Sequence, residues 1–300
     1  MTNRKKALIL LNTAAGMGKA ENYSLEISRR FAEEGYEPLI YPIIPGTDLV
    51  SEKLLAEYDG EVEMVLCSGG DGTLNHTMRG IMEMQKPPRI AYIPAGSTND
   101  FATGLGISSS FDEALETALH GRLFRYDAGC LNDCYFNYVA AFGAFSALSY
   151  ATNQKLKNIM GHAAYIVSAM SDLRNNMRYN CHMRIETDQG REEGDYIFGA
   201  VCNSASIGGF EMFRDTEVDL DDGRMELLLI KAPANPVELQ KILNSLRKGE
   251  MHSDHISLRQ IRNAHIVSDS NTAWTIDGEF GGSYEEVDIE VLRRVVPIMM

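Results

Sequence analysis

The chain has 300 residues, of which 44% are hydrophobic and 23% are charged, with a formal net charge of −14 at pH 7. This length exceeds what a single hydrophobic core usually organises, so we expect one large or two medium-sized domains. The negative charge argues against nonspecific binding to nucleic acid or to an anionic membrane, although a local basic patch can override it.

The first 125 residues alternate between strand-like and helix-like segments. Four apolar runs predict strands: Lys6–Leu11, Leu39–Ile44, Val62–Cys67 and Arg89–Ile93. Four segments predict helices: one carrying Ile27 and Phe31, one over Leu49–Tyr58, one carrying Leu74 and Met78, and one after Ser110, which forms a capping box with Glu113. This alternation predicts a mostly parallel, doubly wound α/β sheet.

Strands dominate after residue 125. They are expected at Leu123–Asp127, Tyr135–Ala141, His182–Thr187, Tyr196–Cys202, Met225–Lys231, His265–Val267, Trp274–Ile276, Val287–Leu292 and Val295–Met299. Two helices are expected among them, one within Leu156–Met177 and one that begins at Asn235-Pro236 and ends near Gly249. The sequence therefore predicts an α/β domain over residues 1–125 and a β-rich, antiparallel, sandwich-like domain over 126–286, with 287–300 returning to the first domain.

No segment predicts a membrane span or a signal peptide. The charge-free stretch Cys134–Gln154 is interrupted by polar residues, and the apolar core of the N-terminus, Ala7–Leu11, is too short for a signal peptide. The five cysteines form no C-x-x-C pair, which suits a reducing compartment. We expect a cytoplasmic protein whose membrane contact is peripheral.

Three loops that follow predicted strands combine glycine with polar residues. They are Asn12–Lys19, Gly69–Thr73 (GGDGT) and Ile93–Phe101 (IPAGSTNDF). Glycines at such positions allow a positive φ and close approach of the backbone to an anion, and successive N–H groups form a phosphate pocket. Since strand ends of an open α/β sheet are also where ligands bind, the three loops together predict a nucleotide cleft between the two domains.

The motifs GGDGTLNHTM (69–78), IPAGSTNDFATGLG (93–106) and DGEFGG (277–282) occur in one order along the chain. In this combination the chain resembles the bacterial diacylglycerol kinase-like lipid kinases, which are related to sphingosine kinases and more distantly to NAD kinases and phosphofructokinases. The resemblance covers essentially the whole chain. It implies a lipid kinase that uses ATP and Mg²⁺.

The resemblance also implies roles for individual residues. Eight residues would lie at the nucleotide: Asn12, Gly69, Gly70, Asp71, Gly72, Thr73, Ser97 and Asp100. Glu279 would be the general base, and Asp71, Asp100 and Asp127 would contribute to the Mg²⁺ network, partly through water. A second metal position would involve Asp219, Asp222 and Arg224, the outer two through their carbonyls. Alternatively, residues 219–224 form a hairpin turn before the strand Met225–Lys231.

Two positions depart from the family pattern. The first loop begins Asn12-Thr13 where relatives usually have Asn-Pro. Many relatives place a nucleotide-contacting threonine after the second strand, where this chain has Pro42 and a displaced Thr47.

Several functional readings stay open. The first is a kinase that phosphorylates a lipid, most simply diacylglycerol to phosphatidic acid. The others are an NAD kinase-like enzyme, which shares GGDGT, and a non-catalytic regulator that binds nucleotide or lipid. A basic group with nearby aromatic residues predicts peripheral contact with anionic lipid: Lys155, Lys157, Arg174 and Arg178 with Phe142, Phe145 and Tyr150. No nucleic-acid partner is expected, and the oligomeric state is open, with a homodimer the commonest assembly.

Overall fold

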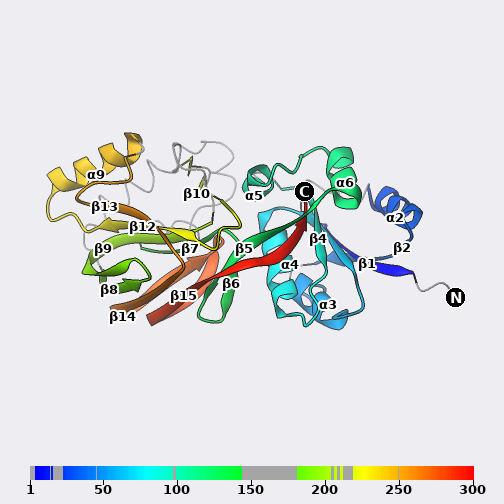
Figure 1. Ribbon diagram of the computed structural model, residues 1–300, viewed down its shortest axis with the longest axis horizontal. Coiled ribbons are helices and arrows are strands. Elements are labelled where there is room, and N and C mark those ends of the chain that lie inside the picture. The colour runs from blue at the N-terminus through cyan, green and yellow to red at the C-terminus, as the bar shows by residue number, and fades with distance from the viewer. Residues whose placement is uncertain are drawn as a thin grey trace. The chain divides into compact units, whose positions relative to one another are not determined.

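The computed structural model describes residues 4–13, 15, 23–44, 46–96, 99–143, 181–203, 206–207, 210–211, 219–248 and 250–300. The chain divides into two compact units, unit 1 (Met1–Tyr126 with Arg294–Met300) and unit 2 (Asp127–Arg293). Unit 1 contains helices and strands, and unit 2 is rich in strands (Figure 1). The predicted combination of an α/β domain with a β-rich domain is therefore confirmed.

Some predicted features lie outside the described residues. They are the helix within Leu156–Met177, the basic group of Lys155, Lys157, Arg174 and Arg178, the aromatic residues Phe145 and Tyr150, most of the loop that follows Thr13, and Ser97. The backbone of Asp100 is described but its side chain is not.

The sheet of unit 1 has strands that run in the same direction. The strands are β1 (Lys5–Asn12), β2 (Tyr36–Ile43), β3 (Met64–Gly69) and β4 (Arg89–Pro94). β1 pairs in parallel with β2 and β3, and β3 pairs in parallel with β4. The end of the last strand of the chain, β15 (Glu279–Met299), also pairs with β4, at Ile298. Because the strands are parallel, the loops that follow β1, β3 and β4 leave one edge of the sheet.

Helices lie on both faces of this sheet (Figure 1). They are α2 (Ser24–Glu33), α3 (Ser51–Glu57), α4 (Asp71–Glu83), α5 (Asp100–Gly104) and α6 (Phe111–His120). Phe31 of α2 and Leu115 of α6 share a buried cluster with Ile9 of β1. A Cβ on Gly80 of α4 would lie 2.6 Å from Leu55 Cδ1 of α3, so glycine lets these two helices pack closely.

The capping box predicted at Ser110 and Glu113 is wrong. Ser110 is the N-cap residue of α6, but its side chain makes no capping hydrogen bond. Ser108 takes that place: its Oγ donates to Glu113 Oε2 at 2.5 Å and accepts from the Ser110 amide at 3.1 Å. The hydroxyl two residues earlier thus occupies both groups that the predicted capping box would pair, the Ser110 amide and the Glu113 carboxylate.

The helix start predicted at Asn235 is confirmed. Helix α9 spans Pro236–Lys248, and Asn235 Oδ1 accepts hydrogen bonds from the amides of Val237 and Glu238, each at 3.0 Å. Asn235 thus satisfies amide groups that have no partner within the helix.

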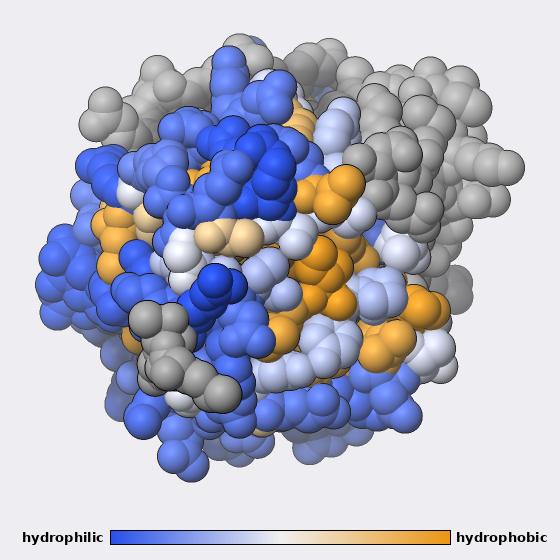
Figure 2. All heavy atoms as spheres, turned by 90° about the vertical axis from the view of Figure 1, so that its right-hand side faces the viewer, coloured by the Kyte–Doolittle hydropathy of each residue, from blue (hydrophilic) through white to orange (hydrophobic). Residues whose placement is uncertain are grey.

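Strand β2 lies at one end of the strand order, with β1 as its neighbour among the described residues. Figure 2 shows apolar side chains gathered within a largely hydrophilic face on this side. Ile40 of β2 and the nearby Ile44 are 38% and 39% exposed. Pro38 and Pro42 lie in the strand and lack an N–H group, which protects such an edge against pairing with another strand.

Antiparallel strands form the main part of unit 2. In chain order they are β5 (Leu123–Leu131), which begins in unit 1, β6 (Cys134–Phe136), β7 (Val139–Gly143), β8 (Cys181–Thr187), β9 (Gly190–Cys202), β10 (Ser206–Ile207), β11 (Phe210–Glu211), β12 (Met225–Lys231), β13 (Ile256–Ile261), β14 (Asn263–Ile276) and β15. β9 pairs with β7, β8 and β12, and β14 pairs with β7, β8 and β15, all antiparallel.

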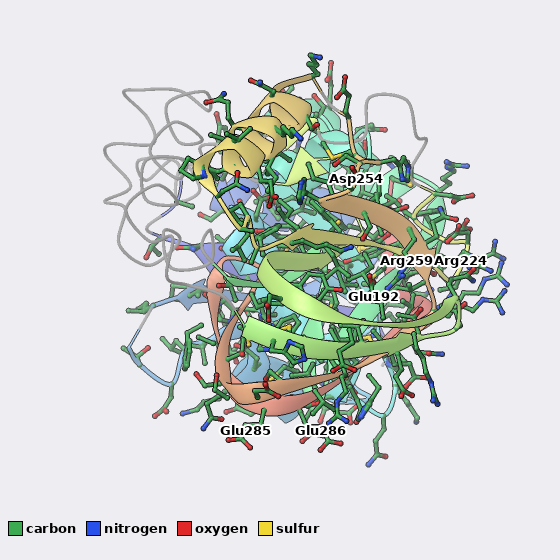
Figure 3. The ribbon with its side chains drawn as sticks, turned by 90° about the vertical axis from the view of Figure 1, so that its left-hand side faces the viewer. Glu192, Arg224, Asp254, Arg259, Glu285 and Glu286 are labelled. Atoms are coloured by element: carbon green, nitrogen blue, oxygen red, sulfur yellow. The ribbon has the colours of Figure 1, made fainter. Side chains whose placement is uncertain are left out.

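The side chains of these strands form two separate buried clusters. One contains Phe142 and Trp274, whose rings meet edge to face with centroids 5.0 Å apart. The other contains Leu228 of β12 and Ile242 of α9. On the outside, charged side chains cover the strands, with Glu192 beside Arg259 in an ion pair (Figure 3). Unit 2 is therefore sandwich-like, with apolar layers and a charged outer surface.

The boundaries of several predicted strands are wrong. The single strand expected at Tyr135–Ala141 is two strands, β6 and β7, interrupted at Asn137 and Tyr138. The amides of those two residues bind the carboxylate of Asp277 rather than a neighbouring strand. Conversely, the pairs of short strands expected after residue 263 are the continuous strands β14 and β15.

Glu226 of β12 is a buried carboxylate, 4% exposed. Its Oε1 accepts from Gln260 Nε2 at 3.3 Å, while its Oε2 is buried and has no partner in the part of the chain that the structure describes. Burial raises the pKa of this carboxyl to about 7. The pKa in the folded chain is therefore higher than the pKa of about 4.3 expected in the unfolded chain. Protonation of Glu226 contributes its full stabilisation below about pH 4.3. It is lost as the pH rises through 7.

We therefore expect Glu226→Gln to change the pH dependence of unfolding. Between pH 5 and pH 8.5, the free energy of unfolding of the variant should rise relative to wild type by roughly 3 kcal/mol. Urea titration in EDTA, followed by the fluorescence of Trp274, measures this for unit 2, because Trp274 is the only tryptophan of the sequence. If the free energies of unfolding of Glu226→Gln and wild type differ by the same amount at both pH values, the pKa of Glu226 is not raised.

Candidate functional site

In unit 1, side-chain and backbone hydrogen bonds join three loops at the ends of strands. Asn12, the last residue of β1, donates from Nδ2 to Thr73 Oγ1 at 2.8 Å. The amide of Ala95, just after β4, donates to the carbonyl of Gly69 at the end of β3 at 2.7 Å. The structure thus brings together Asn12, the GGDGT loop and the start of the loop after β4.

The positive φ expected at the glycines of these loops is wrong, while the expected close approach of the backbone to an anion stays a prediction. None of Gly69, Gly70, Gly72 and Gly96 has a positive φ. A Cβ on Gly69 would lie 2.2 Å from Thr73 Oγ1, and one on Gly96 would lie 2.6 Å from the Cα of Gly70. Gly69 is needed because the side chain of Thr73 fills the space of its Cβ, and Gly70 and Gly96 are needed because their backbones pack against each other. A Cβ on Gly72 would meet nothing within 4 Å, so packing does not require this glycine.

Asp71 is the first residue of α4 and is half-buried. Negative groups are stabilised at a helix N-terminus, and main-chain N–H groups there bind anions. The amide of Thr73, however, donates to Gly70 O at 2.9 Å and so belongs to the first turn of the helix. A phosphate at this loop would have to use the amides that precede Thr73.

Tyr92 of β4 binds the GGDGT loop, although no sequence motif marks this residue. It is 1% exposed, and its hydroxyl donates to the carbonyl of Gly69 at 3.1 Å. Burial raises its pKa well above the ordinary value, and the charge of Asp71 adds to this shift, so the hydroxyl keeps its proton. A single hydroxyl in an apolar strand was the available signal.

Asn99 shapes the loop after β4 and was also missed. It has φ of 53° and is the N-cap residue of α5. Its Oδ1 accepts from the Gly96 amide at 2.9 Å, and its Nδ2 donates to the Gly96 carbonyl at 3.0 Å. Asparagine tolerates a left-handed conformation, and here its side chain binds both backbone groups of Gly96.

In unit 2, Glu279 follows a two-residue hairpin turn made by Asp277 and Gly278. Their φ angles are 50° and 87°, and Ile276 pairs with Glu279 across the turn. Positive φ at both central residues defines the turn that Asp-Gly favours. Glu279 is exposed and is the first residue of β15.

Asp277 fixes this turn to another part of unit 2. It is 7% exposed, and its carboxylate accepts from the amides of Asn137 at 2.8 Å and of Tyr138 and Val139 at 3.0 Å. Its own amide donates to Val139 O at 2.8 Å. The hairpin that carries Glu279 is therefore anchored by charge-assisted hydrogen bonds rather than being a free surface turn.

Asp127 is fully buried and holds a second turn of unit 2. Its amide donates to Leu220 O at 2.8 Å, and its Oδ2 accepts from the Gly223 amide at 2.6 Å. Within that turn, Asp219 Oδ1 accepts from the Asp221 amide at 3.3 Å and Asp222 Oδ1 accepts from the Arg224 amide at 2.7 Å. These bonds are those of a tight turn before β12.

The same turn has the chemistry of a site for a hard cation. Carboxylate and carbonyl oxygens, such as those of Asp219, Asp222 and Arg224, are the ligands that Mg²⁺ prefers. Each aspartate uses one oxygen for the turn, which leaves its second carboxylate oxygen and the backbone carbonyls for coordination. The predicted second metal position stays a prediction.

Another cluster of possible ligands lies elsewhere in the described part of unit 2. His265, Glu286 and Asp288 place one ligand atom each within 4.8 Å of one another. The two ring nitrogens of His265 face different carboxylates, Asp288 at 2.8 Å and Glu286 at 3.7 Å. This arrangement is an exposed ion-pair group and contains none of the predicted site residues.

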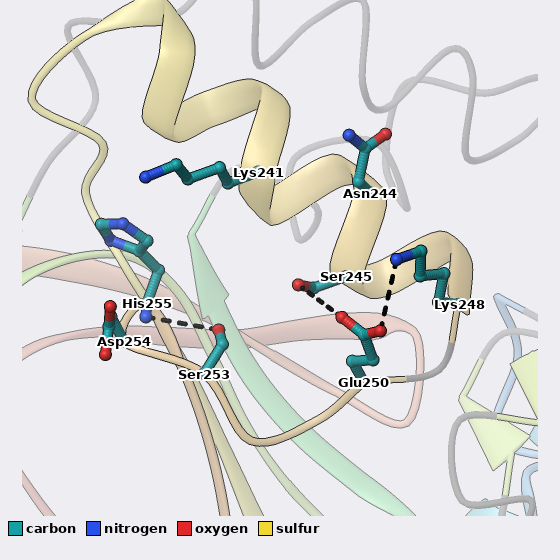
Figure 4. A pocket seen from close by; sticks show the side chains of 8 residues that line it. All are labelled: Lys241, Asn244, Ser245, Lys248, Glu250, Ser253, Asp254 and His255. Carbon is teal, nitrogen blue, oxygen red and sulfur yellow. Dashed lines mark hydrogen bonds and ion pairs between the residues drawn. The ribbon is translucent and has the colours of Figure 1, made fainter.

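A cavity of about 270 Å³ lies beside the C-terminal half of α9 (Figure 4). Within it, Lys248 pairs with Glu250 at 3.5 Å, and Ser245 Oγ donates to Glu250 Oε2 at 3.3 Å. None of the predicted site residues lines this cavity, so it is separate from the candidate site.

Two further sequence features receive structural partners. His76 of α4 pairs with Glu52 of α3 through Nδ1. The hydroxyl of Thr47 donates to Ile44 O at 2.8 Å and accepts from the Leu49 amide at 3.1 Å, within its own turn. Thr47 therefore has a local role in its own turn.

Two family models match consecutive parts of the chain. Residues 6–131 match the diacylglycerol kinase catalytic domain, and residues 139–300 match the YegS C-terminal NAD kinase beta sandwich-like domain. The chain is 31% identical to a diacylglycerol kinase of Staphylococcus carnosus over 93% of this chain and 90% of that protein. It is 28% identical to a diacylglycerol kinase of Bacillus subtilis over 98% of this chain and 96% of that protein.

The fold also has a solved relative. The crystal structure of a Bacillus anthracis protein described as a diacylglycerol kinase matches with a TM-score of 0.78 at 21% identity, covering 100% of this chain and 98% of that one. At this identity the match establishes a shared fold.

The packing of the glycines predicts different outcomes for two similar substitutions. Gly69→Ala should lower the free energy of unfolding of unit 1 by about 1–3 kcal/mol, because its Cβ overlaps Thr73. Gly72→Ala adds the same methyl group to open space within α4 and should keep stability or raise it by up to about 1 kcal/mol, because alanine favours a helix over glycine. Thermal melts compare the two variants, and equal destabilisation would refute the packing explanation.

The anchoring by Asp277 predicts a large loss of stability in Asp277→Ala. Three amides would lose their acceptor, so the free energy of unfolding should fall by roughly 2–4 kcal/mol. Asp254, an exposed carboxylate of unit 2 (Figure 3), provides the control: Asp254→Ala should change stability by less than about 0.5 kcal/mol. Urea unfolding followed by Trp274 fluorescence measures both, and a small effect at Asp277 would show that the hairpin needs no anchor.

Proposed function

The chain belongs to the diacylglycerol kinase family, and from this premise we propose that this lipid kinase uses ATP and Mg²⁺ to phosphorylate a lipid hydroxyl, most simply converting a diacylglycerol to phosphatidic acid.

The observation that carries the proposal is the hydrogen-bonded assembly of three strand-end loops in unit 1. Asn12 bonds Thr73, Ala95 bonds Gly69, and Asn99 closes its loop on Gly96. Such an edge, with a helix N-terminus at Asp71, favours the phosphates of a nucleotide. We assign the triphosphate of ATP to this edge, with Gly70–Gly72 supplying amides and Asn12, Ser97 and Asp100 completing the site.

Mg²⁺ would neutralise phosphate charge and bridge phosphate oxygens. Asp71 and Asp100 lie at the first residues of α4 and α5, where such an ion would meet the phosphates. Asp127 is buried and bonded to Gly223, so it would act on the metal network partly through water or through the turn that it holds. Asp219, Asp222 and Arg224 would hold a second ion that stabilises this turn.

Glu279 is our candidate for the general base. An exposed carboxylate on an anchored hairpin can accept the proton of the lipid hydroxyl while it is held in a fixed direction. The hydroxyl oxygen then forms a bond to the γ-phosphorus, the bond to the β,γ-bridging oxygen breaks, and ADP leaves. In this proposal the loops of unit 1 bind the nucleotide, and Glu279 takes the proton of the acceptor.

A lipid acceptor is consistent with the surroundings of Glu279. The next residue, Phe280, is 63% exposed, which offers apolar surface next to the proposed base. Among the described residues, no helix is long and apolar enough to cross a membrane. We therefore propose that the lipid is reached by peripheral contact with the bilayer from the cytoplasm. Dimer formation stays a prediction.

Incubation with γ-labelled ATP, Mg²⁺ and diacylglycerol in mixed micelles tests the acceptor. We expect labelled phosphatidic acid, and no labelled product when EDTA replaces Mg²⁺. A parallel reaction with NAD distinguishes the NAD kinase reading. Label that appears in NAD and in no lipid would overturn the proposal, and the absence of any product from every acceptor would favour a binding protein.

The role of Glu279 predicts a loss of rate without a loss of fold. Glu279→Gln keeps the size of the side chain but cannot accept the proton, so kcat should fall by ~10²–10⁴-fold. Glu285→Gln, which changes another exposed glutamate of β15 (Figure 3), is the matched control and should keep wild-type activity. If both variants keep the wild-type kcat while their melting temperatures are unchanged, Glu279 is not the base.

A further inference from the structure

We propose that Asn203 is a positioning residue of the phosphotransfer site, which couples the hairpin of Glu279 to the turn of Asp219, Asp222 and Arg224. This inference rests on the proposed function and deepens it. Asn203 directly follows β9 and belongs to none of the sequence motifs described above.

Asn203 is fully buried and makes two hydrogen bonds to parts of unit 2 that are far apart in sequence. Its amide donates to Tyr138 O at 2.9 Å, and its side chain donates from Nδ2 to Asp127 O at 2.8 Å. The backbone and the side chain of one residue therefore hold two separate segments.

The segment held by the backbone is the one that anchors the hairpin. Tyr138 lies between Asn137 and Val139, and the amides of all three bind the carboxylate of Asp277. Asp277 is two residues before Glu279. Any shift of Tyr138 would thus be transmitted to the proposed base through the hydrogen bonds of Asp277.

The segment held by the side chain is the one that anchors the second turn. Asp127 has its carbonyl fixed by Asn203, while its amide and its carboxylate bind Leu220 and Gly223. The carboxamide of Asn203 therefore sets the position of the backbone from which Asp127 reaches this turn.

The chemistry of Asn203 supports a role beyond stability. Its Oδ1 is buried and has no hydrogen-bond partner among the described residues, and an unpaired buried polar atom lowers the stability of a fold. Only Nδ2 makes a bond, and an aspartate of the same shape would place an oxygen against the Asp127 carbonyl. We therefore explain Asn203 by the position that its Nδ2 gives to the Asp127 carbonyl, and not by a gain in stability.

Asn203→Leu tests the coupling, since leucine fills a similar volume without donating a hydrogen bond. Ser268→Ala is the control, because Ser268 is also buried in unit 2, 7% exposed, and donates to Ser270 O at 2.9 Å. Three quantities are measured for each: stability from Trp274 fluorescence, amide exchange at Gly223 and at Asn137–Val139, and kcat with the KM for diacylglycerol. Asn203→Ser, which is smaller and also lacks the amide donor, replaces the leucine variant if that variant does not fold.

We expect Asn203→Leu to speed exchange at both Gly223 and Asn137–Val139 by ~10-fold, the equivalent of losing one buried hydrogen bond. Its kcat should fall by ~10–100-fold with an unchanged KM, because the base is displaced rather than the lipid site. Ser268→Ala should lose stability and keep both the exchange pattern and kcat.

The proposal is overturned if exchange changes at Gly223 alone, or if kcat falls equally in Asn203→Leu and Ser268→Ala. Amide exchange is measured without substrate, so it tests the coupling through Asn203 separately from the proposed lipid kinase activity. Coupled exchange in an enzyme that phosphorylates no lipid would refute the proposed function and leave the coupling intact.

Discussion

The carboxylate of Asp277 is the interaction on which the chemistry of unit 2 depends. It binds three successive amides, and in doing so it ends one strand, begins another and fixes the hairpin that carries Glu279. A glutamate on an unanchored turn would sample many orientations, and a general base works only within hydrogen-bond reach of the proton it removes. A buried anion, satisfied by backbone donors, therefore converts a surface turn into a defined position for a second, exposed anion.

In unit 1, close packing of backbone segments holds the loops in position. Gly70 and Gly96 let two loops touch. Asn12 and Tyr92 each bind a neighbouring loop with one hydrogen bond, and Asn99 binds Gly96 of its own loop with two. Phosphoryl transfer depends on positioning and on neutralising charge, so rigid loops with small residues suit it better than flexible cationic side chains. In the proposed function, both units place the functional group at a turn that polar partners hold in position.

Much of this could be predicted from the sequence. Hydrophobic periodicity located the strands and helices of unit 1, because each helix buries one face on the sheet, and the motifs located the loops. The role of the glycines could not be predicted, since the letters Gly-Gly-Asp-Gly do not distinguish a positive φ from a close contact. The break at Asn137 has its cause in Asp277, 140 residues later. Asn203 and Tyr92 were missed because they stand next to or within apolar strands, and their partners are set by the fold.

A structure with a non-hydrolysable ATP analogue, Mg²⁺ and diacylglycerol tests the central claim most directly. The account predicts the triphosphate against Gly70–Gly72 and a carboxylate oxygen of Glu279 within about 3.2 Å of the acceptor hydroxyl, directly or through one water. A bound acceptor whose hydroxyl faces the γ-phosphate while Glu279 points to bulk solvent would contradict it.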